Sequence, residues 1–191
     1  DAFFAGSCIA ESDNLLHRVE QMLTDGAAIL DIGGQSTRSN SERVSADEEL
    51  KRVIPAIKAI HRNFPQAAIS IDTFYAVVAK EAIAAGAAIV NDISAGTLDK
   101  DLLPTVAKLG VPYVLMHMKG DPQTMQKNPS YVNVTLEVFD QLSFAIKNLQ
   151  RQGIHDIIID PGFGFGKTIT HNFQLLRELH FFQQLGKPVL G

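Results

Sequence analysis

Only one cysteine, Cys8, occurs in the 191 residues of this sequence, and no apolar run reaches the length of a membrane span, about 18 residues. A single cysteine excludes an intramolecular disulfide and a metal site made of cysteines. The start of the sequence also lacks the basic and apolar segments of a signal peptide. The 17 basic residues are outnumbered by 21 acidic ones and form no run, which argues against a nucleic-acid surface. These absences favour a soluble, cytoplasmic protein that binds neither membrane nor nucleic acid.

What the sequence does contain is typical of one globular domain, which we place at residues 1–191. Apolar residues make up 46% and charged residues 20%, and no linker or low-complexity segment divides the chain. The sequence starts at Asp1 without a methionine and stops at Gly191, where an apolar run has only begun. We therefore expect both ends to be cut.

Short apolar runs alternate with segments of helical periodicity along the whole sequence. The runs predict strands at 27–32, 67–71, 87–93, 112–118, 156–160 and, as a start only, 187–190. The segments between them predict helices at about 14–24, 45–60, 74–85, 99–109, 133–152 and 172–185. Nearly continuous apolar runs are typical of strands buried on both faces, and strands that alternate with helices form right-handed crossovers. The sequence therefore predicts an α/β fold with a parallel sheet.

Local signals support this division. Ser45-Ala46-Asp47-Glu48 has the spacing of a capping box, with a glutamate three residues after the serine. Segments 25–31 and 85–91 are similar enough to indicate a weak internal repeat. A glycine precedes most predicted strands, as expected of a helix that ends in a left-handed residue; these are Gly26, Gly86, Gly110, Gly153 and Gly186.

Each predicted strand ends in polar residues or in a glycine-rich turn. These ends are Asp31-Ile32-Gly33-Gly34, Asp72-Thr73, Asn91-Asp92, His117 and Asp160-Pro161-Gly162. A buried carboxylate needs a partner or a ligand, although any single one could instead cap a helix. Five such ends at equivalent positions favour a site. In a parallel barrel they meet on one face, whereas an open doubly wound sheet would spread them along an edge.

Two glycine-rich segments resemble phosphate-binding loops. Residues 162–168 end in Gly-Lys-Thr, but the nucleotide-binding pattern needs a glycine where Pro161 stands, and no helix is predicted to begin at Lys167. This disfavours nucleotide binding. Residues 33–38 are a better anion cradle, because small residues let backbone N–H groups approach an oxyanion and Arg38 can pair with it. The alternative is a flexible loop with a solvated arginine.

Three ring side chains follow predicted strands. His117 has no second histidine at ligand spacing, so a hydrogen-bonded structural role is favoured over a zinc site. Phe163 and Phe165 alternate with glycines. They could cap the core, or they could cover an aromatic ligand.

Five motifs in order resemble those of the dihydropteroate synthases. They are residues 31–38 (Asp-Ile-Gly-Gly-Gln-Ser-Thr-Arg), 70–73 (Ser-Ile-Asp-Thr), 90–93 (Val-Asn-Asp-Ile), 115–126 with Leu-Met-His-Met at its start, and 159–167 (Ile-Asp-Pro-Gly-Phe-Gly-Phe-Gly-Lys). The resemblance covers essentially the whole chain. It implies a (β/α)8 TIM-type barrel in which 27–32 is the second strand and 187–191 begins the seventh. The first and eighth strands would be missing here.

The resemblance also implies an activity. Dihydropteroate synthases are transferases of folate biosynthesis and sulfonamide targets, and they join 6-hydroxymethyl-7,8-dihydropterin diphosphate to p-aminobenzoate with release of diphosphate. It further implies a homodimer when the chain is complete. The cofactor implied is Mg²⁺, whose asparagine ligand would lie upstream, so no metal ligand is expected within this chain.

Position by position, the resemblance assigns a pterin site. Asp72, Asn91 and Asp160 would bind the pterin ring, since a carboxylate accepts from paired donors and an asparagine both donates and accepts. Ile93 and Met116 would pack on its faces. Asp72 and Asp160 would also support catalysis by stabilising positive charge that develops on the ring. The side chain of Asp92 is expected to point to the other side of its strand.

The p-aminobenzoate side is assigned in the same way. Thr37, Arg38 and Ser39 resemble the loop that closes over p-aminobenzoate and the diphosphate, and Phe163 and Phe165 the aromatic wall. Ser39 stands where the family usually has proline. Serine lacks the fixed φ and the apolar ring of proline, so we expect a looser loop here.

Two alternatives stay open at this point. A methyltetrahydrofolate–corrinoid methyltransferase has the same barrel and similar contacts, but the Met-His-Met and Gly-Phe-Gly-Phe-Gly segments favour the synthase. An inactive pterin-binding fragment is the other alternative. A barrel without its first and eighth strands has unpaired edges, so we expect residues 1–191 alone to be inactive.

Overall fold

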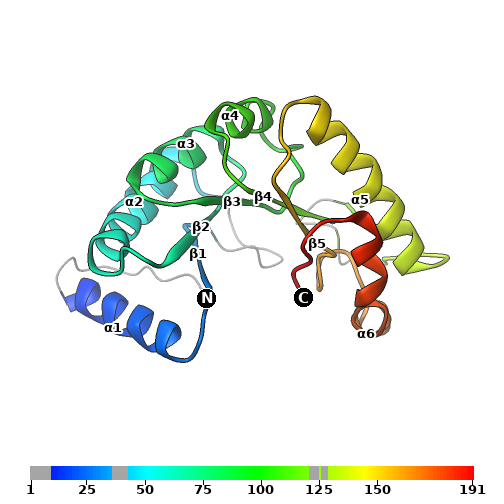
Figure 1. Ribbon diagram of the computed structural model, residues 1–191, viewed down its shortest axis with the longest axis horizontal. Coiled ribbons are helices and arrows are strands. Elements are labelled where there is room, and N and C mark those ends of the chain that lie inside the picture. The colour runs from blue at the N-terminus through cyan, green and yellow to red at the C-terminus, as the bar shows by residue number, and fades with distance from the viewer. Residues whose placement is uncertain (1–9, 36–42, 121–124, 126–128) are drawn as a thin grey trace.

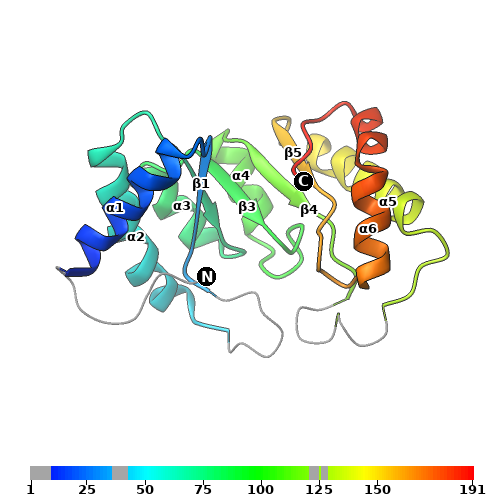
Figure 2. The ribbon, with the colours of Figure 1, turned by 90° about the horizontal axis from the view of Figure 1, so that it is seen from below.

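The computed structural model describes residues 10–35, 43–120, 125 and 129–191, and in these segments strands and helices alternate. Figure 1 shows the helices as an outer arc around a curved sheet, which leaves the inner face of the sheet open. Figure 2 shows α1 and α2 beside β1 at one end of the sheet, with α5 and α6 beside β5 at the other. No helix within the described segments is long and apolar enough to cross a membrane.

The sheet confirms the five complete strands that the apolar runs predict. It consists of β1 (Ile29–Gly33), β2 (Ala68–Asp72), β3 (Ile89–Asp92), β4 (Tyr113–Met116) and β5 (Ile157–Asp160). All neighbouring pairs are parallel, and the strand order in the sheet is the order in the sequence. The run predicted at 187–190 forms an isolated parallel bridge between Val189 and Ile159, where the N–H of Ile159 donates to Pro188 O at 2.9 Å. It therefore lies beside β5.

The helices follow the predicted ranges, with one correction. They are α1 (Ala10–Thr24), α2 (Ala46–Asn63), α3 (Ala76–Ala85), α4 (Leu102–Leu109), α5 (Val134–Arg151), α6 (Ile169–Arg177) and the 3-10 helix η1 (Leu179–Leu185). One helix was predicted at 172–185, whereas α6 begins at Ile169 and is followed by η1. The reason is a capping box: the hydroxyl of Thr168 accepts from the N–H of His171, and the His171 ring accepts from the N–H of Thr168, both at 3.2 Å.

The predicted capping box of α2 is only half formed. The Ser45 hydroxyl accepts from the N–H of Glu48 at 3.3 Å, as expected of an N-cap. The Glu48 carboxylate does not return the bond to Ser45 but pairs with Arg52 at 3.1 Å, one turn along the helix. The cap still fixes where α2 begins.

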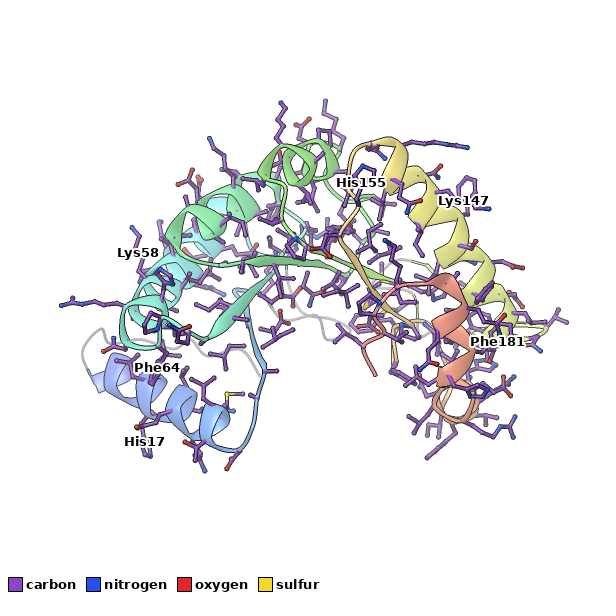
Figure 3. All side chains as sticks on the ribbon, viewed as in Figure 1. His17, Lys58, Phe64, Lys147, His155 and Phe181 are labelled. Atoms are coloured by element: carbon purple, nitrogen blue, oxygen red, sulfur yellow. The ribbon has the colours of Figure 1, made fainter. Side chains whose placement is uncertain are left out.

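The outer face of the sheet packs against the helices and forms the core. Ile69, Ile71, Val90 and Ile159 all point to this face and are fully buried. The outer sides of the helices carry charged residues: Figure 3 shows Lys58 on α2 and Lys147 on α5 projecting away from the sheet. Because strand side chains alternate, the residues between the core positions face the open inner side.

Asp92 confirms the expected alternation. Its side chain lies on the helix side of β3, where it is fully buried. It accepts from the hydroxyl of Tyr113 at 2.8 Å and from the N–H groups of Ser94 at 2.7 Å and Gly96 at 2.6 Å. Burial and the nearby Asp92 carboxylate raise the pKa of Tyr113, which keeps its proton for this bond. Asp92 is thus committed to the local structure of the turn after β3.

Candidate functional site

The strand register brings the predicted polar residues to one face. Asp31 is paired with Ser70, Asp72 with Asn91, and Met116 with Asp160. Paired residues of parallel strands point to the same side, so these six side chains share the inner face of the sheet. The Asn91 amide on β3 donates to the Asp31 carboxylate on β1 at 3.1 Å, across the strand β2 that lies between them. This confirms that Asp31, Asp72, Asn91 and Asp160 meet on one face, whereas His117, the remaining predicted strand end, follows Met116 and contacts Lys167.

Three carboxyl groups on the inner face, those of Asp31, Asp72 and Asp160, have raised pKa values and so hold protons more tightly than usual. Burial raises the pKa of Asp72 to about 8, and the negative charges of Asp31, Glu49 and Asp92 add to the effect. Burial also raises the pKa of Asp31, although the side chains of Ser70 and Asn91 oppose it. The inner face of the ligand-free protein therefore retains a proton near neutral pH.

Asp160 belongs to the same cluster. Burial raises its pKa, and the N–H of Gly162, at 2.7 Å, and the positive charge of Lys167 oppose the rise. The carboxylate is thus oriented by the turn that follows β5, which fixes one of its oxygens.

Asp31 is a site residue for which the sequence predicted no role, although it begins the first of the five motifs, residues 31–38. The internal repeat could have identified it, because the segments 25–31 and 85–91 place Asp31 and Asn91 at equivalent strand positions. The structure joins these two residues by a hydrogen bond.

Two apolar side chains were predicted to pack on the ligand: Met116 is paired with Asp160 on the inner face, and Ile93 follows Asp92 in the sequence. Ile93 and Met116 are buried at 8% and 4% exposure. They also line a cavity of about 270 Å³ between the turn after β3, the end of β4 and α5, together with Ser94, His117 and Gln141. The described lining of this cavity includes no carboxylate, so the packing of Ile93 and Met116 on a pterin ring stays a prediction.

Lys167, the lysine of the Gly-Lys-Thr segment, is turned inward. Its ammonium donates to the carbonyl oxygens of Gly162 at 2.8 Å, Phe165 at 3.0 Å and His117 at 3.3 Å. It also lies 3.0 Å from Nδ1 of His117. Burial lowers the pKa of Lys167 to about 7, although the negative charge of the Asp160 carboxylate acts to raise it. A lysine held by its own loop has no donor left for a phosphate, which agrees with the prediction against nucleotide binding.

His117 has the structural role that the sequence favoured. It is 4% exposed, and burial together with the charge of Lys167 lowers its pKa to about 3, so the ring is neutral. The described residues contain no group of three histidine, cysteine or acidic side chains that could hold a metal ion. The predicted Mg²⁺ and the position of its ligand stay predictions.

The turn after β5 lies directly against the backbone that follows β4. A Cβ on Gly162 would collide with the carbonyl oxygen of His117, and one on Gly166 with that of Lys119. Both glycines also have positive φ, 72° and 64°. Phe163 packs against the core, the first of the two alternatives for this residue, while Phe165 is partly exposed.

Thr37, Arg38 and Ser39 lie outside the described residues, so their assignment stays a prediction. The described segment that follows them, at residues 43–44, is attached to the fold. The Tyr75 hydroxyl donates to Val44 O at 2.9 Å, and the guanidinium of Arg43 lies 4.9 Å from the centre of the Phe74 ring.

We expect the Asp72 carboxyl group to titrate near pH 8 in the ligand-free protein. Because this pKa exceeds the ordinary 3.8, the folded state binds the proton more tightly than the unfolded state. The contribution of Asp72 to stability is therefore present below about pH 4 and is lost as the pH rises to about 8. Carbon-13 NMR of labelled aspartate measures the midpoint, and Asp31→Asn should lower it. A midpoint below about 5 would contradict this reading.

We expect Gly162→Ala to destabilise the protein by about 2–4 kcal/mol, because the new methyl group meets the His117 carbonyl and the residue must keep a positive φ. Gly164→Ala is the matched control. Gly164 also has a positive φ, 82°, but no atom lies within 4 Å of its would-be Cβ, so only backbone strain of about 1–2 kcal/mol is expected. Urea unfolding measures both, and equal losses would rule out the close backbone approach.

Comparison with known proteins agrees with this geometry. The family model described as pterin binding enzyme matches residues 1–191. The dihydropteroate synthase of Haemophilus influenzae is 44% identical over 193 residues, which cover 100% of this chain and 70% of that protein. A mitochondrial bifunctional folate synthesis protein of Arabidopsis thaliana is 43% identical, and the match covers 94% of this chain but 33% of that protein.

Solved structures give the same result. The Yersinia pestis dihydropteroate synthase in a sulfonamide drug complex has a TM-score of 0.90 at 38% identity, covering 99% of this chain and 69% of that one. The Xanthomonas albilineans enzyme in complex with 7,8-dihydropteroate has a TM-score of 0.82 at 37% identity, covering 97% and 66%. The five-stranded parallel sheet with its outer helices is an incomplete (β/α)8 barrel, as the motifs predicted, and the chain belongs to the pterin-binding enzymes as a dihydropteroate synthase.

Proposed function

We propose that the protein carrying this chain condenses 6-hydroxymethyl-7,8-dihydropterin diphosphate with p-aminobenzoate to give 7,8-dihydropteroate and diphosphate. The observation that carries the proposal is the cluster of Asp31, Asp72, Asn91 and Asp160 on one face of the sheet. The relatives named as dihydropteroate synthases support this activity over that of a corrinoid methyltransferase.

The cluster suits the polar edge of a pterin. A pterin presents an amino group and a ring N–H side by side, and an ionised carboxylate accepts both bonds. Asp72 and Asp160 are the carboxylates in this role, and Asn91 supplies a donor and an acceptor. Binding such donors favours the ionised form of Asp72, so the proton that it holds in the empty site is released. Ile93 and Met116 then cover the faces of the ring.

The reaction places a positive charge close to these carboxylates. The bond between the exocyclic CH₂ carbon and the diphosphate oxygen breaks, and that oxygen keeps the electron pair. The amine nitrogen of p-aminobenzoate forms the new bond to the carbon and then loses a proton. The cation is delocalised into the pterin ring, where the negative charges of Asp72 and Asp160 stabilise it.

The p-aminobenzoate side of the proposal rests on the resemblance and on one structural feature. The glycine-rich turn that follows Asp160 carries the partly exposed Phe165, and Phe163 in the same turn packs against the core. The Xanthomonas albilineans relative has been solved with 4-aminobenzoic acid, and the Yersinia pestis relative with a sulfonamide drug. We place p-aminobenzoate, and sulfonamides that imitate it, against Phe165 and the 37–39 loop.

The remaining parts of the proposal come from the family. Mg²⁺ would accompany the diphosphate and neutralise its charge, with a ligand upstream of residue 1. A homodimer in the cytoplasm is the arrangement that we propose for the complete protein, and sedimentation of that protein tests its oligomeric state.

We expect Asp160→Asn and Asp72→Asn to weaken pterin binding at least about tenfold, because an amide turns a donor toward the donors of the ligand and leaves a buried pair unsatisfied, at about 1–3 kcal/mol. Asp92→Asn is the matched control, since Asp92 lies on the other side of β3 and contacts Tyr113. It should change binding by less than about threefold. Calorimetry with 6-hydroxymethylpterin on the folded complete protein measures all three. Equal losses in the three variants would refute the assignment of the inner face.

A further inference from the structure

Glu49 is a fully buried carboxylate outside the cluster on the inner face. It lies in the first turn of α2 and has an exposure of 0%. It was not among the residues that the sequence analysis assigned to the site. The apolar spacing of α2, which includes Leu50 and Val53, gave no reason to expect a buried charge next to them.

The Glu49 carboxylate connects the segments that follow two neighbouring strands. One of its oxygens accepts from the side-chain amide of Gln35 at 2.8 Å and from the Thr73 hydroxyl at 3.3 Å. Gln35 follows β1 by two residues, and Thr73 directly follows Asp72 at the end of β2. The two strands are themselves paired at their last residues, Gly33 and Asp72.

The backbone after β1 also rests on Glu49. A Cβ on Gly34 would lie 2.7 Å from Cγ of Glu49, so only glycine permits this approach. Arg52, one turn further along α2, donates to Gly34 O at 3.0 Å. The first turn and a half of α2 therefore contacts Gly34 and Gln35 and fixes the position of this segment.

No cation contacts the Glu49 carboxylate directly among the described residues. The nearby Arg52 forms its ion pair with Glu48 instead. Burying a carboxylate without a cation costs several kcal/mol, and an apolar side chain of similar volume is usually at least as stable in such a position. Burial accordingly raises the pKa of Glu49, and its hydrogen bonds to Gln35 and Thr73 oppose the rise. Packing alone does not account for an acidic residue here.

We propose that Glu49 is a positioning residue of the pterin site, which holds the carboxyl ends of β1 and β2 together through Gln35 and Thr73 and thereby fixes Asp72. The proposal rests on the proposed function for the identity of the ligand, but not for the contacts. Glu49 touches neither substrate nor reacting atoms and acts through its neighbours.

The position of Glu49 has an electrostatic consequence for Asp72. Its negative charge is one of the causes that raise the pKa of Asp72, after burial and the charge of Asp31, and together with that of Asp92. Asp72 must be ionised to accept two donors from a pterin. The Glu49 charge thus adds to the retention of the Asp72 proton in the ligand-free protein and should raise the pH above which the pterin binds tightly.

The experiment compares Glu49→Gln with the native complete protein over pH 5–9, with 6-hydroxymethylpterin as the probe. Glutamine retains the size of the side chain and can still bond Gln35 and Thr73 after rotation of the amides, so the fold should persist. Without the charge, the midpoint of the pH dependence of binding should move down by about one unit. The carbon-13 titration of Asp72 in the ligand-free protein should move by the same amount.

Two further variants separate charge from position. Thr73→Val removes the bond to Glu49, together with the bond that the Thr73 hydroxyl accepts from the N–H of Tyr75, but it keeps the Glu49 charge. The maximal affinity should therefore fall about three- to tenfold while the midpoint does not move downward. Asp47→Asn removes an exposed charge from the same helical turn and should change neither quantity.

The outcomes distinguish this inference from the proposed function. If the native protein does not bind the pterin, the proposed function fails, and the titration of Asp72 alone decides the role of Glu49. If the pterin binds but the midpoint of Glu49→Gln stays within about 0.2 units of the native value, the inference is overturned. An equal shift in Asp47→Asn would overturn it as well, because the effect would then be that of net charge.

Discussion

The group of acidic residues on the inner face of the sheet is the constraint on which the rest of this structure depends. Parallel register and the two-residue alternation of strand side chains bring Asp31, Asp72 and Asp160 to the same face. Burial raises the pKa of all three, and repulsion from Asp31 raises the pKa of Asp72 and Asp160 further. This arrangement is unfavourable for the empty protein. The same arrangement favours a ligand that offers hydrogen-bond donors and develops positive charge.

Two buried charged residues hold the loops around this group, one on each side. Lys167 binds three backbone carbonyl oxygens and joins the turn after β5 to the end of β4. Glu49 joins the segments after β1 and β2 through Gln35 and Thr73. Both side chains are buried, and Lys167 and one carboxylate oxygen of Glu49 hydrogen-bond to neutral groups. Lys167 and Glu49 thus fix the segments that carry the site residues.

The elements could be predicted largely from the sequence because their signals are local. Apolar runs located the five strands, and the glycines before them take the positive φ expected of helix C-caps, as at Gly86 and Gly110. The helix was predicted to begin at 172 because Thr168 was not recognised as its N-cap, which it forms with His171. The polar residues at the strand ends identified Asp72, Asn91 and Asp160 as a group, and the opposite orientation of Asp92 followed from alternation alone.

The sequence by itself determined the strands, the order of the motifs and the side of each strand on which a residue lies, since these depend on neighbours within a few positions. Only the tertiary structure decided which residues meet. The register of β1 with β2 and β3 brought Asp31 to Asn91, 60 positions away, and the packing of α2 brought Glu49 under Thr73, 24 positions away. The buried position of Lys167 likewise depends on its contacts with the carbonyl oxygen and ring nitrogen of His117, 50 positions away. Contacts of this kind depend on how helices and strands pack, and the local pattern of residue types does not encode that packing.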